Sequence, residues 1–388
     1  MTTRREMPRA SRTGPLFAPL RLGALTLPNR VVMAPMTRSR AAGDGTPGLL
    51  APTYYAQRAS AGLIISEAAH IDPHGVGYPN TPGIHNERHV AGWRNVIRAV
   101  HGEGGRIFLQ LWHVGRISHP SVQPDGGAPI APSPMAAEGE LFTASGMRPF
   151  VTPRALGIQE IPGVVEQFAR AAQLARDAGC DGVDIHAANG YLIDQFLRSG
   201  SNCRSDAYGG SVANRARFLL EVVEAVTGVW GPERVGVRLS PLSPYNSMSD
   251  SDPMETFTYV GRALHRLGIG YLHIAEPGPG HPMSTPAGCQ LLAALRSAFS
   301  ACFVVDGGRD RVSAEAALAA ANADLVALAT PFIANPDLVE RLARGVPLAV
   351  ADPKTFYAGG ARGYTDYPKY VACAGLPPAR SQEWLSKI

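Results

Sequence analysis

Short runs of aliphatic and β-branched residues alternate with helical patterns along most of this 388-residue chain. Helix patterns occupy 164–178, 212–226, 253–267 and 311–320. Eight strand candidates lie at 30–34, 63–67, 106–112, 182–186, 235–240, 271–275, 302–306 and 324–329. Strands that alternate with helices form parallel sheets, and eight such units close into a (β/α)₈ TIM barrel. We therefore expect an α/β protein built on a single barrel.

Two additions to a plain barrel are expected. The segment 118–162 is rich in proline and glycine and is too long for a simple connection, so we predict a hairpin excursion after the third strand that caps the barrel mouth. An N-terminal hairpin is expected to act as a lid. We assign the barrel to 15–370, between a disordered basic tail at 1–14 and a C-terminal tail at 371–388. A doubly wound sheet is the alternative fold, but no GxGxxG motif follows the first strand.

The composition narrows the possible partners. Hydrophobic residues make up 45% and charged residues 18% of the chain, as in ordinary globular proteins. The net charge of +4 is small and scattered, so we expect no nucleic-acid binding. No apolar run reaches the roughly 18 residues that span a bilayer, and we expect no membrane association. The arginines of the tail at 1–14 leave a targeting segment as a minor alternative. Five cysteines without paired spacing predict free thiols in the cytoplasm.

Strand alternation places polar side chains inside the predicted barrel. Gln110 and Trp112 share one face of their strand, opposite three aliphatic residues. Arg238 lies opposite the aliphatic face of its strand, and Asp184 and His186 do the same on theirs. An apolar core does not select such residues. The simplest occupant of the barrel mouth is therefore a bound polar cofactor.

The turn from His186 to Tyr191 carries an imidazole, an amide and a phenol within six residues. It follows a predicted strand and precedes a predicted helix, at the face where barrel enzymes place their catalytic groups. His186 and Asn189 are hydrogen-bond donors suited to a carbonyl oxygen, and Tyr191 is suited to donate a proton. A lone histidine at a strand end is more often structural, and a lone tyrosine is often a core aromatic. Together, the three predict polarisation and protonation of an unsaturated carbonyl compound.

The chain resembles the Old Yellow Enzyme family of FMN-dependent ene-reductases. The resemblance runs from about residue 16 to residue 368 and rests on seven motifs in family order. Besides 186–191, these are NRVVMAPMTR at 29–38, GLIISEA at 62–68, QLWHVGR at 110–116, RSDAYGGS at 204–211 with Asn214 and Arg215, FIANPDL at 332–338 and GYTDYP at 363–368.

The resemblance implies roles for residues throughout the barrel mouth. Tyr191 is implied as the proton donor, with His186 and Asn189 binding the substrate oxygen. The expected FMN contacts are Pro35, Met36, Thr37, Ala68, Gln110 and Arg238 around the ring, and Gly307, Gly308, Arg309, Ala329 and Thr330 near the phosphate. The expected substrate walls are Tyr78, Trp112, Tyr245, Asn246 and Tyr364. NADPH or NADH is the implied reducing cosubstrate.

One position departs from the family pattern. The family carries Gly-Arg before Pro-Phe-Ile, where the arginine contacts the FMN phosphate, whereas this chain has Ala329-Thr330. Loss of one charged hydrogen bond costs about 1.5–3 kcal/mol, which corresponds to roughly 10- to 100-fold in affinity. We predict that Arg309, on the adjacent loop, supplies the missing charge.

The leading functional hypothesis is an NAD(P)H-dependent flavin oxidoreductase that reduces activated C=C bonds of carbonyl or nitro compounds. The alternative is a repurposed flavin barrel that performs a redox-neutral isomerisation or a specialised biosynthetic step. A non-catalytic binding module fits poorly, because the trio at 186–191 is intact. His85 and His89 lack a third ligand, so no metal site is expected. Both a monomer and a homodimer are compatible with the sequence.

Overall fold

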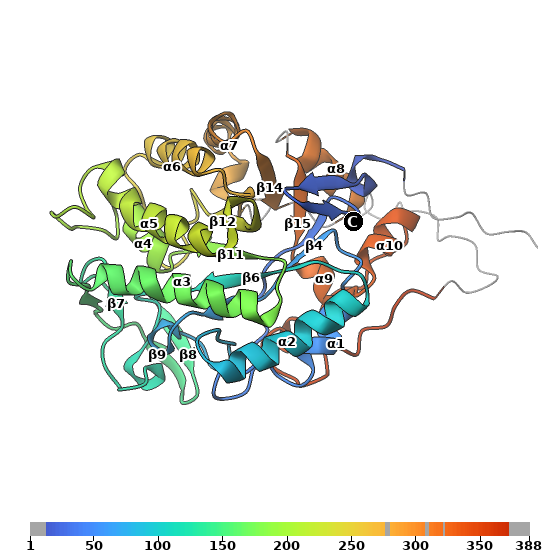
Figure 1. Cartoon of the computed structure of the whole chain (residues 1–388), viewed down its shortest axis with the longest axis horizontal. Coiled ribbons are helices and arrows are strands. Elements are labelled where there is room, and N and C mark those ends of the chain that lie inside the picture. Colours follow the sequence, from blue (N-terminus) through green and yellow to red (C-terminus); the bar gives the residue numbers. More distant parts are fainter. Residues whose placement is uncertain (1–12, 276–279, 307–309, 321–322, 372–388) are drawn as a thin grey trace, which may run out of the picture.

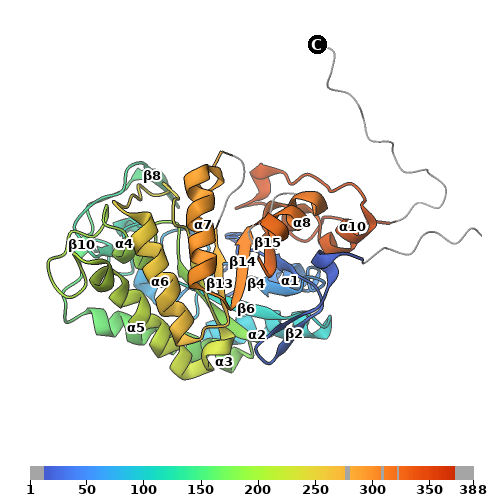
Figure 2. The same ribbon diagram turned by 90° about the horizontal axis from the view of Figure 1, so that it is seen from above.

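Eight parallel strands form the centre of the molecule, as predicted. The computed structural model describes residues 13–275, 280–306, 310–320 and 323–371. The strands follow one another around the sheet, and a pairing between β6 and β11 closes it into a barrel (Figures 1 and 2). In order around the barrel they are β3 (Val31–Met33), β4 (Leu63–Ile65), β6 (Ile107–Trp112), β11 (Gly182–Ala187), β12 (Val235–Leu239), β13 (Tyr271–Ile274), β14 (Cys302–Asp306) and β15 (Leu325–Leu328).

Helices connect these strands and cover the outside of the barrel (Figure 2). They are α1 (Ala51–Ala56), α2 (Glu87–Gly102), α3 (Ile161–Ala178), α4 (Leu192–Leu197), α5 (Val212–Trp230), α6 (Pro253–Leu267), α7 (Pro286–Ala298), α8 (Arg311–Ala320), α9 (Thr330–Ala334) and α10 (Leu338–Arg344). Proline opens six 3₁₀ turns, where its fixed φ suits the first helical position. These are η1 (Pro15–Phe17), η2 (Pro73–Gly75), η3 (Pro120–Val122), η4 (Pro232–Arg234), η5 (Pro282–Ser284) and η6 (Pro353–Thr355).

The predicted helices are confirmed, and two are longer than expected. Helix α3 begins at Ile161 because Pro162 fits its first turn, where no backbone N–H is needed. Helix α5 continues to Trp230, whose indole N–H donates to the Ala172 carbonyl of α3 at 2.9 Å. Side-chain caps fix other helix starts, for example Asp252, which accepts from the Glu255 amide at α6.

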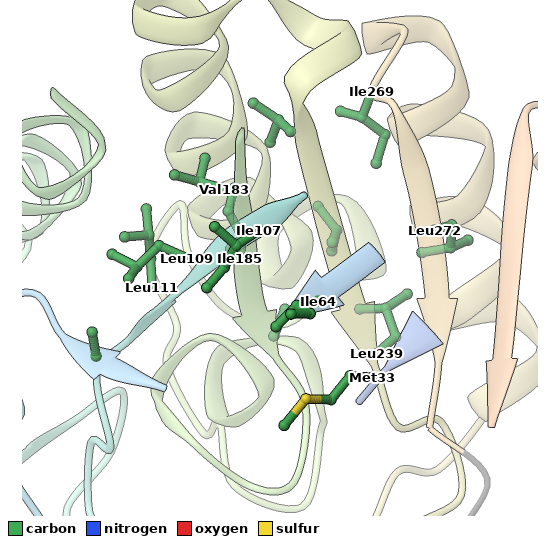
Figure 3. Packing of buried hydrophobic residues seen from close by; sticks show 14 of the residues in the cluster. Met33, Ile64, Ile107, Leu109, Leu111, Val183, Ile185, Leu239, Ile269 and Leu272 are labelled. Carbon is green, nitrogen blue, oxygen red and sulfur yellow. The ribbon is translucent and has the colours of Figure 1, made fainter. Parts of the chain in front are cut away.

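Two separate apolar cores stabilise the barrel. The larger one lies between the strands and the surrounding helices, with Leu109, Val183 and Leu272 among its members (Figure 3). The smaller one fills the inside of the barrel with residues such as Val32, Phe108 and Val304. Leu22 and Leu27 join this inner core from the antiparallel hairpin of β1 (Leu20–Leu22) and β2 (Leu25–Leu27). The predicted N-terminal hairpin therefore exists, and it plugs the end of the barrel where the strands begin.

The predicted excursion folds over the opposite end. It contains the hairpin of β8 (Glu140–Thr143) and β9 (Gly146–Pro149), and the parallel pair β7 (Ile130–Ala131) and β10 (Arg154–Ala155). Its Ala137 and Leu141 pack in one cluster with Trp112 and Tyr191. A further short strand, β5 (Ala69–His70), pairs with β6 at the same end. The excursion thus covers part of the barrel mouth.

Two other expectations concern the chain as a whole. Cys180, Cys203, Cys289 and Cys302 are free, as predicted, and Cys373 lies outside the described residues. No helix in the described ranges is both long and apolar enough to cross a membrane. The predicted tails at 1–14 and 371–388 fall almost wholly outside those ranges.

Candidate active site

Polar side chains meet inside the barrel above the inner core. The Gln110 amide donates to one oxygen of Asp184 at 2.7 Å, and the Tyr271 hydroxyl donates to the other at 2.8 Å. Gly236, paired in register with Tyr271, leaves the space that the Tyr271 ring fills. Burial raises the pKa of Asp184. This layer separates the apolar interior from the open mouth of the barrel.

Arg238 lies in the next layer, as its position in the strand predicted. Its guanidinium is 3.5 Å from an Asp306 oxygen, and the other oxygen contacts His273 Nε2 at 2.8 Å. Arg238 pairs in register with His186 on one side and His273 on the other. The guanidinium is therefore held by neighbouring strands at the level of the predicted catalytic turn.

The turn between β11 and α4 is fixed by its backbone. Asn189 has a left-handed φ of 59°, a conformation that asparagine tolerates better than most residues. Its amide donates to Ser240 Oγ at 2.7 Å, and its carbonyl accepts from the Asn246 side chain at 2.8 Å. Gly190 follows, with its amide bound by Asp194 Oδ2 at 2.8 Å. These contacts fix the backbone of the turn that carries the three predicted catalytic residues.

Four rings pack together at this turn. The Tyr191 ring lies 5.0 Å from the His186 ring and 5.0 Å from the Trp112 ring. Tyr78 stacks on Trp112 at 6.0 Å, and its hydroxyl lies 3.4 Å from the Tyr191 hydroxyl. All four were predicted as catalytic or wall residues. The structure brings them together.

Burial sets the protonation state of this group. It lowers the pKa of His186 well below its ordinary value, and the positive charge of Arg238 lowers it further. The imidazole is therefore neutral at physiological pH. Burial also raises the pKa of Tyr191, and the neighbouring Tyr245 adds to that effect. Tyr191 therefore holds its proton until a stronger base forms beside it.

The residues expected to line a flavin ring lie on adjacent strand ends. Pro35, Met36 and Thr37 follow β3, and Ala68 follows β4, which pairs with β3. A hydrogen bond of 3.0 Å from the Arg38 amide to Glu67 Oε2 joins the two loops. Ala68 packs in the cluster that contains Trp112 and Tyr191. Ala68 therefore lies beside the rings of the candidate catalytic turn, and the contact between Arg38 and Glu67 joins the loop of Pro35, Met36 and Thr37 to the loop that carries Ala68.

The predicted role of Tyr364 as a cavity wall is corrected by its position. Tyr364 is 1% exposed and stacks on Tyr54, with ring centroids 4.1 Å apart. Its ring packs against arginines instead of the cavity rings. A tyrosine seven positions earlier, Tyr357, is 64% exposed and lies within electrostatic reach of Tyr191 and Tyr245. Sequence reasoning missed Tyr357, although the glycines after it mark a loop.

Only some of the residues expected near the FMN phosphate lie within the described ranges. Ala329 and Thr330 lie where β15 ends and α9 begins, with Thr330 exposed. Gly307, Gly308 and Arg309 lie outside the described residues. The replacement of the family arginine by Arg309 therefore stays a prediction.

Buried polar atoms at the barrel mouth fit a bound cofactor. Within the described ranges, Arg238 Nε, Trp112 Nε1 and His186 Nδ1 are buried without a hydrogen-bond partner. Such orphaned donors are costly, so a molecule with oxygen and nitrogen acceptors stabilises them on binding. A flavin ring offers these acceptors on a flat apolar body. In the same ranges, no group of three or more His, Cys, Asp or Glu residues is arranged to hold a metal ion.

Comparison with known proteins also indicates a flavin-binding oxidoreductase. A model of the NADH:flavin oxidoreductase / NADH oxidase family matches residues 15–349. The 12-oxophytodienoate reductase 7 of Oryza sativa subsp. japonica is 43% identical over 372 residues, covering 91% of this chain and 94% of that protein. The 12-oxophytodienoate reductase 2 of Arabidopsis thaliana is 42% identical over 369 residues, covering 94% and 98%.

Solved structures agree in fold and sequence. Morphinone reductase in complex with tetrahydroNAD is 50% identical, with a TM-score of 0.88 over 93% of this chain and 99% of that chain. An old yellow enzyme homologue from Zymomonas mobilis is 42% identical, with the same TM-score over 92% and 100%. The resemblance expected from the motifs is confirmed. This chain belongs to the NADH:flavin oxidoreductase / NADH oxidase family, the Old Yellow Enzyme family, and is an oxidoreductase that uses FMN and a nicotinamide cosubstrate.

Proposed function

We propose that this enzyme is an ene-reductase that uses NAD(P)H to reduce activated C=C bonds of α,β-unsaturated carbonyl or nitro compounds. The observation that carries the proposal is the packing of a neutral imidazole, His186, against a protonated phenol, Tyr191, on a fixed turn whose strand is in register with Arg238. Relatives named as 12-oxophytodienoate reductases and morphinone reductase support the reaction class.

The residues proposed to hold the flavin ring surround the barrel mouth. Thr37 is assigned to the flavin O4, and Gln110 and Arg238 are assigned to its pyrimidine edge. Pro35, Met36 and Ala68 line the ring. When bound, reduced FMN supplies a hydride to the β-carbon of the substrate. The positive charge of Arg238 favours the anionic reduced state.

His186 and Asn189 bind the substrate oxygen. As the hydride arrives at the β-carbon, negative charge develops on this oxygen, and preorganised donors in a water-poor site stabilise such charge. The low pKa of His186, caused by burial and by Arg238, keeps the imidazole neutral, so it donates a hydrogen bond without losing its proton. The fixed backbone of Asn189 keeps its amide in place during this step.

Tyr191 supplies the proton to the α-carbon. Its raised pKa, caused mainly by burial, makes the phenol a donor only toward the strongly basic enolate carbon. The Tyr78 hydroxyl, 3.4 Å away, then stabilises the Tyr191 phenolate until solvent returns a proton. One hydride and one proton are thus added across the C=C bond.

The decisive experiment is a visible spectrum of the purified holoenzyme during turnover. We expect flavin absorption that bleaches with NADPH or NADH under anaerobic conditions and returns when 2-cyclohexenone is added. A colourless protein, or a bleached flavin that no enone or nitroalkene reoxidises, contradicts the proposal. Product analysis distinguishes reduction from a redox-neutral isomerisation, which consumes no nicotinamide.

A further inference from the structure

A single arginine donates hydrogen bonds to five backbone carbonyls of one loop. The loop covers 355–363, after the 3₁₀ turn η6. The acceptors of the Arg40 guanidinium are the carbonyl oxygens of Thr355 (2.8 Å), Phe356 (3.2 Å), Ala358, Gly360 (2.8 Å) and Arg362 (3.1 Å). A guanidinium carries its N–H donors in a rigid plane. The loop therefore wraps around a preformed template.

Arg38 binds the same loop from beneath. It is fully buried, and it donates to the Phe356 carbonyl at 3.0 Å and to the Gly363 carbonyl at 2.8 Å. Both guanidinium groups pack on the Tyr364 ring, Arg40 at 4.6 Å and Arg38 at 5.3 Å from its centroid. The two arginines thus fix the beginning and the end of the loop.

The backbone between the two arginines is in a disfavoured conformation. Ser39 has a φ of 49°, which for a residue other than glycine costs free energy unless its surroundings impose it. This turn directly follows Thr37, which is assigned to the flavin. Here the contacts of Arg38 and Arg40 with the loop 355–363 hold Ser39 in this conformation. The bend therefore couples the cofactor side of the mouth to a C-terminal loop.

Tyr357 lies in the middle of the bound stretch. The carbonyls of Phe356 and Ala358, immediately before and after it, both accept from Arg40. Its side chain is exposed and lies within electrostatic reach of Tyr191 and Tyr245. With both flanking peptide groups held, the direction of the Tyr357 side chain follows from Arg40.

We propose that Arg40 is a positioning residue that fixes the loop 355–363 and thereby holds Tyr357 at the wall of the substrate cavity. Arg40 itself contacts no substrate. The fit of bulky substrates then depends on a guanidinium that acts through backbone carbonyls.

Limited proteolysis of the holoenzyme tests the loop directly. Chymotrypsin cleaves after Phe356 and Tyr357, and cleavage requires the loop to open. We expect Arg40→Ala to be cut at these bonds about tenfold faster than the wild type, because several hydrogen bonds to the loop are lost. Arg40→Lys keeps the charge but lacks the planar fork, so it should be cut at an intermediate rate.

Arg362→Ala is the matched control. Arg362 is an exposed cation of the same loop, and within the described ranges its guanidinium makes one contact, with Asp352 at 3.5 Å. Its loop should be cut at the wild-type rate. Equal cleavage of Arg40→Ala and Arg362→Ala overturns the proposal. If Arg40→Ala does not fold, Arg40→Lys decides by the same comparison.

A double-mutant cycle tests the link to Tyr357. We expect Arg40→Ala to raise KM for a bulky bicyclic enone about tenfold, with kcat unchanged within about twofold. In the Tyr357→Ala background, Arg40→Ala should add no further change. A full effect in that background overturns the role of Tyr357. This arm rests on the proposed function, whereas proteolysis does not, so a wild type inactive on every enone leaves the loop test intact.

Discussion

Two groups of tyrosines differ in what their hydroxyls and rings contact. The cavity tyrosines are Tyr78, Tyr191, Tyr245 and Tyr357. The anchor tyrosines are Tyr54, Tyr55 and Tyr364. Among the cavity tyrosines, the hydroxyls of Tyr78 and Tyr191 contact each other at 3.4 Å. Among the anchor tyrosines, the rings stack on each other and on arginine side chains.

The difference shows how the same side chain serves chemistry or stability. Tyr54 accepts a hydrogen bond from Arg38 at 3.0 Å, and Tyr55 accepts one from the Glu67 amide at 2.8 Å. These phenols complete structural networks with Arg38 and Glu67. The Tyr191 hydroxyl contacts the Tyr78 hydroxyl, and the Tyr191 ring packs beside those of His186 and Trp112. Its proton is the one that the proposed mechanism transfers.

The largest expected effect separates the two groups by activity. Tyr191→Phe removes the proposed proton donor, and we expect turnover of 2-cyclohexenone to fall about 10²- to 10⁴-fold. Bleaching of the flavin by nicotinamide needs no proton from Tyr191 and should stay within about twofold of wild type. Stopped-flow absorbance measures both half-reactions, the reduction of the flavin by nicotinamide and its reoxidation by the enone. Tyr54→Phe, the matched change among the anchor tyrosines, should leave both rates unchanged, and an equal loss in both variants contradicts the distinction.

The second effect separates the groups by stability. Tyr364→Ala removes a fully buried ring between Tyr54 and the arginines, and we expect the free energy of unfolding to fall by about 3–5 kcal/mol. Tyr364→Phe should change it by less than about 0.5 kcal/mol, since the Tyr364 hydroxyl is buried without a partner within the described ranges. Denaturant titration measures both. A loss of turnover without a loss of stability would restore Tyr364 as a cavity wall.

The third effect concerns pH and the anchor side. Burial raises the pKa of Glu67 from 4.5 to about 7. Between these values the folded protein holds a proton that the unfolded chain has released, so this contribution to stability is complete below pH 4.5 and is lost as pH rises through about 7. Glu67→Gln should remove up to about 1.4 kcal/mol per pH unit from the slope of stability against pH in this window. Identical slopes from thermal unfolding at several pH values would show that Glu67 does not titrate there.

The smallest effect concerns the partner of Tyr191. Tyr78→Phe removes the hydroxyl that is proposed to stabilise the Tyr191 phenolate across a long contact of 3.4 Å. We expect kcat to fall only about three- to tenfold, the equivalent of one neutral hydrogen bond. Steady-state kinetics with saturating enone measure it. A loss as large as that of Tyr191→Phe would make Tyr78 the proton donor instead.

Much of the fold and half of the site could be predicted from short stretches of sequence. The strand at 182–186 and the turn at 186–191 are encoded locally, because alternation, an Asn-Gly pair and the helix start lie within a dozen residues. Helix α3 starts at Ile161, earlier than the predicted 164, because proline suits the first turn of a helix as well as a loop. The wall role given to Tyr364 was wrong for a different reason. The motif at 363–368 does not indicate whether Tyr357 or Tyr364 lies nearer the cavity.

The sequence by itself determined the barrel and the family, and it singled out the candidate turn at 186–191, since each depends on periodicity or on motifs within one segment. Only the tertiary structure decided which tyrosines are catalytic neighbours and which are anchors. Those positions follow from contacts such as that of Arg38 with Gly363, 325 positions apart. Such contacts form when two distant loops meet at one end of the barrel, and no local pattern encodes which carbonyl a guanidinium will reach.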